Sequence, residues 1–103
     1  MDKKYAAQEA ITHSMMGSLG LKLIEEKEGF IRASMPVNDN TSQPFGVLCG
    51  GASLAFAEII AGYGSYLCCP EGFIPVGSSV SGNHVSSVRK APDVLVYAEA
   101  TAL

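Results

Sequence analysis

The sequence predicts an α+β domain in which an antiparallel β-sheet wraps around one long central helix. The sheet is predicted by residues 30–37 and 94–103, where apolar and polar side chains alternate with the period of half-buried strands. The helix is predicted by residues 50–67, which are apolar on every side and carry one charge, Glu58. A chain of 103 residues suffices for one domain, and we assign residues 1–103 to it.

The elements before the long helix are predicted to be a helix and a hairpin. Residues 2–16 show helical spacing of apolar side chains, and Gly17 is expected to end this helix. Residues 20–26 are predicted to be a strand that turns at 27–29 into the strand at 30–37. One face of that second strand is expected to be buried, with Ile31, Ala33, Met35 and Val37.

The second half of the chain is predicted to be a loop, the long helix and two extended segments. The loop at 38–46 is rich in Asn, Asp, Ser, Pro and Gly. The long helix is expected to be buried on most sides and to end near Pro70, which cannot continue a helix. Residues 73–89 are predicted to be a strand, and a turn at 89–93 leads to the last strand. Four residues share one face of the last strand, namely Val94, Val96, Ala98 and Ala100.

Composition and charge exclude several classes of function. The net charge is −3 and the basic residues are scattered, so binding to nucleic acid or to an anionic membrane is not expected. The first 17 residues lack the apolar core of a signal peptide, and no apolar run reaches the length of about 20 residues that spans a membrane. Three cysteines without a C-x-x-C pair predict no disulfide framework and no metal site. We expect a cytoplasmic protein without a cofactor.

Glu58 is the feature of the long helix that most needs an explanation. It is the only charged residue between Asp39 and Glu71, and burying an unpaired carboxylate is costly. It could point into solvent through a gap in the packing, or it could hold a structural hydrogen bond. The third interpretation is a general base or a nucleophile.

The front of the same helix offers a complementary group. Cys49-Gly50-Gly51 places free backbone N–H groups at the positive end of the helix dipole, where they suit an oxyanion or a polarised carbonyl. Gly50 and Glu58 are eight residues apart, which is about 12 Å along one helix. One helix cannot aim both groups at the same carbon, whereas two antiparallel helices in a C2 dimer can. We therefore predict a homodimer with two composite sites.

Other candidates carry weaker signals. Gln43 could position water or substrate, although a loop glutamine is usually only solvated. A lone histidine such as His84 is more often structural, and Cys49 could pair with it only through the fold.

Two stretches, "NDNTSQPFGVLCGGASLAFAE" and "VGSSVSGNHVSSVRKAPDVLVYAEATAL", together resemble the hotdog-fold acyl-CoA thioesterases. The resemblance is to the phenylacetate-degradation type, which includes aryl-CoA and dihydroxynaphthoyl-CoA thioesterases. The family pattern is Asn, a spacer, Gln-Pro-x-Gly, His-Gly-Gly, Ala-Glu and then Asn-His. It implies a hotdog fold, hydrolysis of a small aryl or acyl thioester to the acid and CoA, an acyl-CoA substrate, and a homodimer or homotetramer.

The resemblance also implies roles for individual residues. Glu58 would act on the thioester as general base or nucleophile, Gly50 N–H would polarise the carbonyl, and Gln43 would orient the carbonyl or water. Asn83 and His84 would line the site or the pantetheine channel. The CoA arm would lie near Ser86, Ser87 and Arg89. Further substrate contacts are expected at Cys49, Gly51, Gly62 and Tyr63.

The chain departs from the family pattern in three places. Cys49 stands where relatives usually carry His, and Gly62 stands where they often carry Ser or Thr. The family places two more strands between those predicted at 73–89 and 94–103, so we expect a sheet that is incomplete at the C-terminus. These departures keep a second interpretation open, a non-catalytic hotdog protein that binds an acyl thioester or a hydrophobic ligand. A hydratase on the same fold is disfavoured, because this helix has no His.

Overall fold

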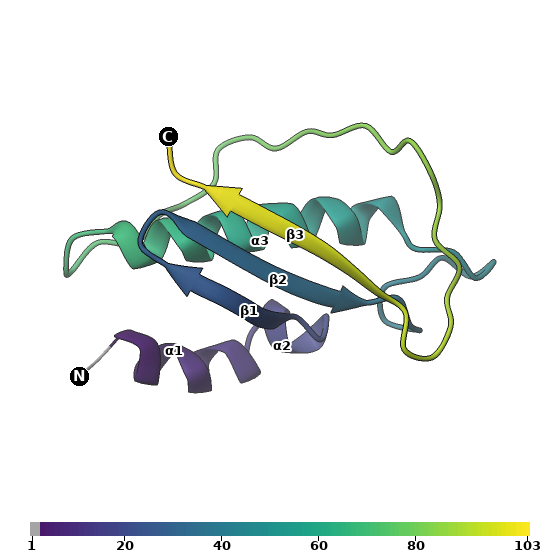
Figure 1. The fold of residues 1–103 in the computed structure, drawn as a ribbon, viewed down its shortest axis with the longest axis horizontal. Coiled ribbons are helices and arrows are strands. Elements are labelled where there is room, and N and C mark those ends of the chain that lie inside the picture. Colours follow the sequence, from purple (N-terminus) through teal and green to yellow (C-terminus); the bar gives the residue numbers. More distant parts are fainter. Residues whose placement is uncertain (1–2) are drawn as a thin grey trace.

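The computed structural model describes residues 3–103, with side chains from Gln8 onward. Asp2, the first residue of the predicted N-terminal helix, lies outside the described residues. Figure 1 shows the helices and strands in chain order, which are α1 (Lys3–Thr12), α2 (Met15–Ser18), β1 (Lys22–Lys27), β2 (Phe30–Pro36), α3 (Gly50–Cys68) and β3 (Leu95–Thr101).

The strands form one antiparallel sheet in the order β1-β2-β3. A tight turn joins β1 to β2, and Gly29 adopts a φ of 82° there, a conformation that favours glycine. β3 returns from the far end of the chain and pairs with β2 from Phe30↔Thr101 to Pro36↔Leu95. Figure 1 shows α3 running along one face of this sheet. The predicted α+β hotdog arrangement, a sheet wrapped on a long helix, is confirmed.

The core lies between the sheet and α3. Ile31, Ala33 and Met35 of β2 are buried, and they pack with Phe56 and Ile60 of α3. The face predicted for the second strand is therefore confirmed, and Val37, just beyond β2, is buried as well. On β3 the predicted alternation is also confirmed, because the residues that contact this core share one face, namely Val96, Ala98 and Ala100.

The predicted N-terminal helix is broken into two. Ser14 lies at the break in an extended conformation, and its Oγ accepts a hydrogen bond of 3.2 Å from the backbone N–H of Met16. The same Oγ donates to the carbonyl of Ile11 at 2.8 Å. Ser14 thus caps a new helix, as serine does well. The prediction that Gly17 ends the helix is wrong, because Gly17 lies inside α2.

The prediction that the long helix is buried on most sides is also wrong for this chain. Within α3, the fully buried residues are Phe56 and Ile60, while Ala57 and Ala61 are exposed. The reason is that α3 packs against β2 and β3, and Figure 1 shows this sheet on one side of the helix. Although α3 is 19 residues long, no helix in the described part of the chain combines the length and apolarity needed to cross a membrane.

Residues 73–89 do not form the predicted strand. Among the described residues 3–103, the one β-bridge of this stretch pairs Arg89 with Val47. The stretch therefore does not pair with the three-stranded sheet. A strand needs a partner for its backbone groups, and this segment passes α3 instead. Figure 1 shows it as the long connection from the end of α3 to the turn before β3.

Three of the contacts between this segment and α3 involve a glycine. Gly77 lies against the Glu58 carboxylate, and a Cβ built on Gly82 would be 3.2 Å from Leu54 Cδ2. At the front of the helix the glycine belongs to α3 itself, where Gly50 lies against His84. The segment therefore runs antiparallel to α3 and close to its backbone.

Replacing Ile60 by Ala is expected to lower the free energy of unfolding by about 2–5 kcal/mol, because Ile60 is 1% exposed and the cavity would not close. Urea denaturation followed by circular dichroism measures this. The matched control is Ile24→Ala on β1, where the side chain is 51% exposed and a loss below about 1 kcal/mol is expected. Equal losses at the two positions would show that Ile60 is not a core residue.

Candidate active site

The front of α3 presents two backbone donors. Cys49 is the N-cap residue, and its carbonyl accepts from the N–H groups of Ala52 at 3.0 Å and Ser53 at 3.2 Å. The N–H groups of Gly50 and Gly51 have no acceptor among residues 3–103. Free N–H groups at the first turn of a helix attract a partial negative charge. This end of α3 can therefore hold a carbonyl oxygen or an oxyanion.

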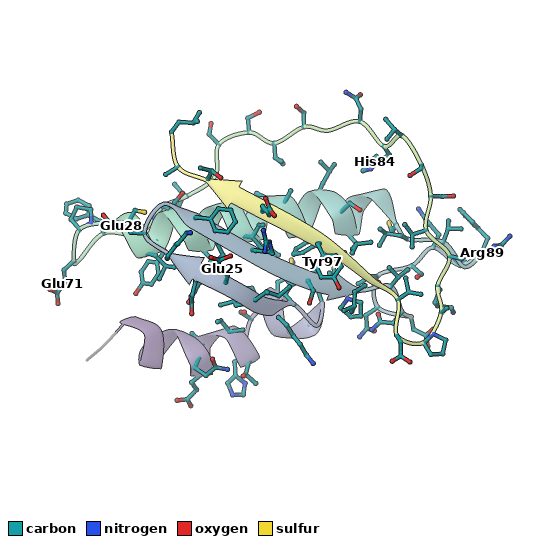
Figure 2. The ribbon with its side chains drawn as sticks, viewed as in Figure 1. Glu25, Glu28, Glu71, His84, Arg89 and Tyr97 are labelled. Atoms are coloured by element: carbon teal, nitrogen blue, oxygen red, sulfur yellow. The ribbon has the colours of Figure 1, made fainter. Side chains whose placement is uncertain are left out.

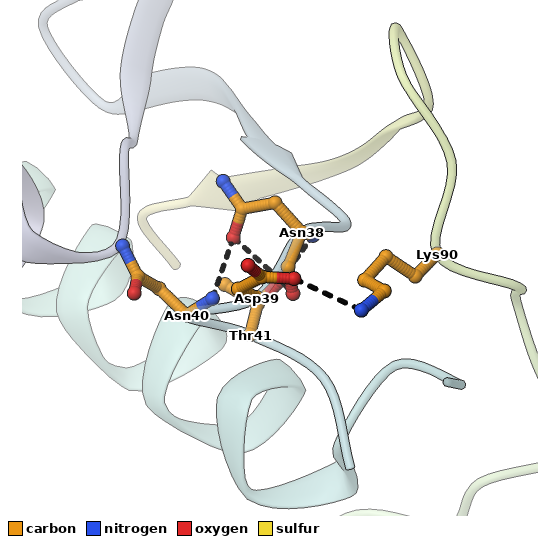
Figure 3. A network of polar contacts seen from close by, with 5 residues as sticks. All are labelled: Asn38, Asp39, Asn40, Thr41 and Lys90. Carbon is orange, nitrogen blue, oxygen red and sulfur yellow. Dashed lines mark hydrogen bonds and ion pairs between the residues drawn. The ribbon is translucent and has the colours of Figure 1, made fainter. Parts of the chain in front are cut away.

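A network of polar contacts holds the loop that leads into α3 (Figure 3). Thr41 is buried, and its Oγ1 donates to the carbonyl of Pro36 at 2.8 Å and accepts from the N–H of Asn38 at 3.0 Å. The Asn38 side chain in turn accepts from the N–H of Asn40 at 3.0 Å. The Thr41 carbonyl then accepts from the N–H of Cys49 at 2.8 Å. Sequence reasoning identified this stretch only as a loop, although its Asn and Thr residues are typical of such turns.

Lys90 ties the segment after His84 to the same loop. Its Nζ lies 2.9 Å from Asp39 Oδ1, and its hydrogen bond and charge hold the pKa of Asp39 below the ordinary value. The backbone N–H of Lys90 donates to the carbonyl of Gly46 at 2.9 Å, and that of Leu48 donates to Val88 at 2.8 Å. The chain just after His84 is thereby held beside the chain that enters α3.

Gln43 lies at a tight turn in this loop. Its N–H donates to the carbonyl of Val47 at 2.8 Å, and its carbonyl accepts from the N–H of Gly46 at 2.9 Å. Gly46 has a φ of 88°, which favours glycine. The structure thus fixes the backbone of Gln43 seven residues before Gly50, the first residue of α3, and Gln43 is half-buried.

His84 packs directly on Gly50. A Cβ built on Gly50 would lie 2.8 Å from His84 Nε2, which is closer than a real Cβ tolerates. The imidazole is otherwise exposed, and Figure 2 shows it on the connection above α3. The structure therefore brings Gly50 and His84 together from distant parts of the sequence, at the end of α3 where the free donors lie.

Glu58 lies two turns further along the same side of α3. Gly50, Leu54 and Glu58 follow one another at intervals of four residues, and each contacts the segment 73–89. The Glu58 side chain is half-buried, and it has neither a hydrogen bond nor an ion pair with any described residue. The proposed structural hydrogen bond is therefore not found in this part of the chain, and the carboxylate is available to solvent or a ligand.

Tyr63 lies apart from this group. Its hydroxyl donates to Glu26 Oε2 on β1 at 3.2 Å, on the sheet side of the helix. Partial burial, followed by the nearby Glu26 carboxylate, raises the pKa of Tyr63 to about 12. Gly62, by contrast, continues the row of Glu58, and a Cβ built on it would meet nothing within 4 Å.

The raised pKa of Tyr63 predicts an alkaline limit to stability. Because the neutral phenol is favoured in the folded protein, its stabilising contribution is complete below pH 10, the ordinary pKa, and is lost as the pH rises through about 12. The difference in ultraviolet absorbance between the protein and Tyr63→Phe isolates this titration. In Glu26→Gln the transition should move only part of the way back to 10, since burial is the larger cause. A native transition at the ordinary value would contradict the packing of Tyr63.

The remaining predicted site residues flank His84 or the helix front. Asn83, Ser86, Ser87 and Arg89 are all exposed on the connection, and Figure 2 shows Arg89 at the end of the molecule that holds the front of α3. The Cys49 thiol is half-buried and makes no capping hydrogen bond. Among the side chains that the structure describes, no three His, Cys, Asp or Glu residues lie close enough to hold a metal ion.

Comparisons with known proteins place this arrangement in a family. Residues 45–103 match the model of the thioesterase superfamily. The 1,4-dihydroxy-2-naphthoyl-CoA hydrolase of Escherichia coli is 39% identical over 77 residues, which are 75% of this chain and 57% of the hydrolase. The chain likewise spans 56% of a putative esterase of Haemophilus influenzae, to which it is 42% identical. It thus spans little more than half the length of these two relatives.

Two solved proteins share the fold. A thioesterase from Haemophilus influenzae superposes with a TM-score of 0.83 at 37% identity, over 98% of this chain and 68% of that one. A thioesterase from Staphylococcus aureus gives 0.75 at 31% identity, over 82% and 69%. The latter has been solved with one glutamine replaced by alanine and with one glutamate replaced by alanine. Taken with the match over residues 45–103, these likenesses show that the chain belongs to the thioesterase superfamily.

Proposed function

We propose that this protein is an acyl-CoA thioesterase that hydrolyses a small aryl or acyl thioester to the acid and CoA. The observation that carries the proposal is the free N–H of Gly50 at the front of α3, with His84 packed against it and the unpaired Glu58 on the same side of the helix. The naphthoyl-CoA hydrolase activity of the Escherichia coli relative supports the substrate class.

Thioester hydrolysis needs a hydrogen-bond donor to the carbonyl oxygen and a general base or nucleophile. The thioester oxygen accepts a hydrogen bond from Gly50 N–H, which stabilises the negative charge that develops on this oxygen. Glu58 removes a proton from water as the water oxygen attacks the carbonyl carbon, and the C–S bond then breaks to release CoA as the thiolate. In the other route the Glu58 carboxylate attacks the carbon itself and the C–S bond breaks to release CoA as the thiolate. Water then hydrolyses the resulting anhydride to the free acid and the Glu58 carboxylate. Gln43 orients the carbonyl or the water in either case.

The spacing of two residues supports these roles for Gln43 and Glu58. In the Staphylococcus aureus thioesterase, the replaced glutamine and the replaced glutamate are separated by the same interval as Gln43 and Glu58 in this chain. The equal interval supports a place for Gln43 in the site. Gln43 lies in the loop before α3, where hydrogen bonds with Val47 and Gly46 hold its backbone.

The active unit is proposed to be a homo-oligomer, a dimer or a tetramer, in the cytoplasm. Along α3, Gly50 and Glu58 are about 12 Å apart, so each site would combine Gly50 of one chain with Glu58 of its partner. Mixing inactive Glu58→Gln and Gly50→Ala proteins should then restore about a quarter of the original activity, because half of the random dimers hold one intact site. If each site were formed within one chain, mixing would restore nothing.

The proposed function is tested by turnover of a panel of acyl-CoA thioesters, followed by the loss of thioester absorbance. We expect hydrolysis of at least one aryl or short acyl thioester. Tight binding of acyl-CoA without turnover would identify a ligand-binding protein and overturn the proposed activity.

A further inference from the structure

Two of the three cysteines are neighbours in the sequence, and they lie at the end of α3 that is remote from the candidate active site. Cys68 is the last residue of α3, and Cys69 caps the helix by donating its N–H to the carbonyl of Tyr66 at 3.1 Å. Gly50, at the other end of this helix of 19 residues, is about 27 Å away along the axis. The two thiols are therefore separate from the groups proposed for catalysis.

Both cysteines line a hollow between α3 and the sheet. Its volume is about 330 Å³, at the lower end of the roughly 300–1,000 Å³ of ligand pockets. Figure 1 shows this end of α3 beside the turn that joins β1 to β2. Phe30 and Ile31 of β2 and Ala61 of α3 contribute apolar walls. The hollow thus places an apolar surface beside the pair of thiols.

The spacing of the two cysteines does not suit a disulfide between them. All three thiols of the chain are reduced in the structure. The Cα atoms of consecutive residues are about 3.8 Å apart, whereas a disulfide joins Cα atoms that are roughly 4.4–6.8 Å apart. A disulfide between neighbours would therefore be strained. A larger thiophilic atom bound to both sulfurs avoids this strain, because it holds them further apart than a direct S–S bond does.

The surroundings of the pair select the kind of atom that it can bind. Among the side chains that the structure describes, no three His, Cys, Asp or Glu residues could hold a metal ion, and structural zinc needs four ligands. Trivalent arsenic that carries one organic group binds two thiols and needs no third protein ligand. Thiolates are soft ligands, which arsenic of this kind prefers. Its organic group is apolar, as are the walls of the hollow.

We propose that Cys68 and Cys69 form a dithiol site for a monosubstituted trivalent arsenical, whose organic group lies in the hollow. In water such a compound carries two hydroxyl groups on arsenic. Each Sγ forms a bond to arsenic as one As–O bond breaks, and each thiol proton leaves with a hydroxide as water. Arsenic remains trivalent, so the step needs no oxidant or reductant. The inference does not depend on the proposed thioesterase function.

The first test uses phenylarsine oxide as the probe, with 2-mercaptoethanol in excess to remove arsenic that is held by a single thiol. Intact-protein mass spectrometry should show one phenylarsenic group on each chain. Cys68→Ser and Cys69→Ser should each lower the apparent affinity by about 10²-fold or more, because the second As–S bond forms within one molecule. Cys49→Ser is the matched control and should keep the group.

Retention of the phenylarsenic group by either Cys68→Ser or Cys69→Ser would overturn the dithiol site, and so would its loss in Cys49→Ser. The competing dithiol 2,3-dimercaptopropanol should remove the group from the unsubstituted protein, since it also offers two sulfurs to one arsenic atom. A group that survives this competitor is not bound as proposed.

The second test fills the hollow. In Ala61→Leu, the ratio of the apparent affinity for phenylarsine oxide to that for methylarsine oxide should fall by about tenfold, because the ring loses its apolar contact. Ala61 is exposed, so the variant should fold. Ala57→Leu, at an exposed position of α3 that does not line the hollow, should keep the ratio. An unchanged ratio in Ala61→Leu would place the organic group elsewhere and overturn its assignment to the hollow.

Discussion

Replacing Glu58 by Gln is expected to lower kcat for acyl-CoA hydrolysis by about 10³-fold, within the roughly 10²–10⁴-fold range of general bases. Glutamine has the shape of glutamate and can fill the same space beside Gly77, so packing on the segment 73–89 is kept. What is lost is the lone pair that accepts the proton of water or attacks the thioester carbon. KM should change little, because the carboxylate acts in the transition state.

The measurement is steady-state hydrolysis of the best thioester of the panel. Glu71→Gln is the matched control, since Glu71 is an exposed glutamate in the turn after α3 (Figure 2) and should leave kcat unchanged. Circular dichroism of both variants excludes unfolding as a cause. Undiminished turnover in Glu58→Gln would remove Glu58 from the mechanism.

Gly50→Ala is expected to lower kcat/KM by on the order of 10²-fold, about the loss of one oxyanion donor. The added Cβ would lie 2.8 Å from His84 Nε2, so the imidazole must move away and the methyl group occupies the approach to the N–H. The contacted atom is the tip of an exposed side chain, so the fold adjusts easily and stability should be nearly unchanged. Alanine is also a good helix former.

Gly51→Ala provides the comparison for this variant. A Cβ at this position would meet only Cys49 Sγ, at 3.7 Å, which is an ordinary contact. The same methyl group should therefore reduce kcat/KM much less at residue 51 than at residue 50. Equal reductions would mean that the effect comes from the helix start in general and not from the displacement of His84.

The local parts of the fold could be predicted from the sequence. Alternation along 30–37 and 94–103 identified the buried faces of β2 and β3, because side chains of a strand point to opposite sides of the sheet. The long helix was predicted at 50–67, and α3 ends one residue later, at Cys68. The end could be predicted this closely because Pro70 cannot continue a helix. The two groups placed on that helix, Gly50 and Glu58, both lie on α3, and their separation of eight residues is about 12 Å along its axis.

Contacts between distant parts of the chain could not be predicted in this way. The approach of His84 to Gly50 depends on how residues 73–89 pass α3, and no local pattern encodes this path. The Val-rich composition of that stretch predicted a strand, but a strand also needs an edge to pair with. The ion pair of Asp39 with Lys90, and the partner of Tyr63 on β1, are likewise set by tertiary packing.

The glycine contacts between α3 and the segment 73–89 couple remote positions to the site. At each contact only one partner has a side chain, so the gap between the two backbones is one side chain thick. A bulkier residue at Gly77 or Gly82 would act as a wedge and force the segment outward. The ion pair of Lys90 with Asp39 holds the chain six residues after His84. The segment would therefore rotate about Lys90 when its middle moves away from α3. His84 would then leave Gly50 although neither residue had been changed.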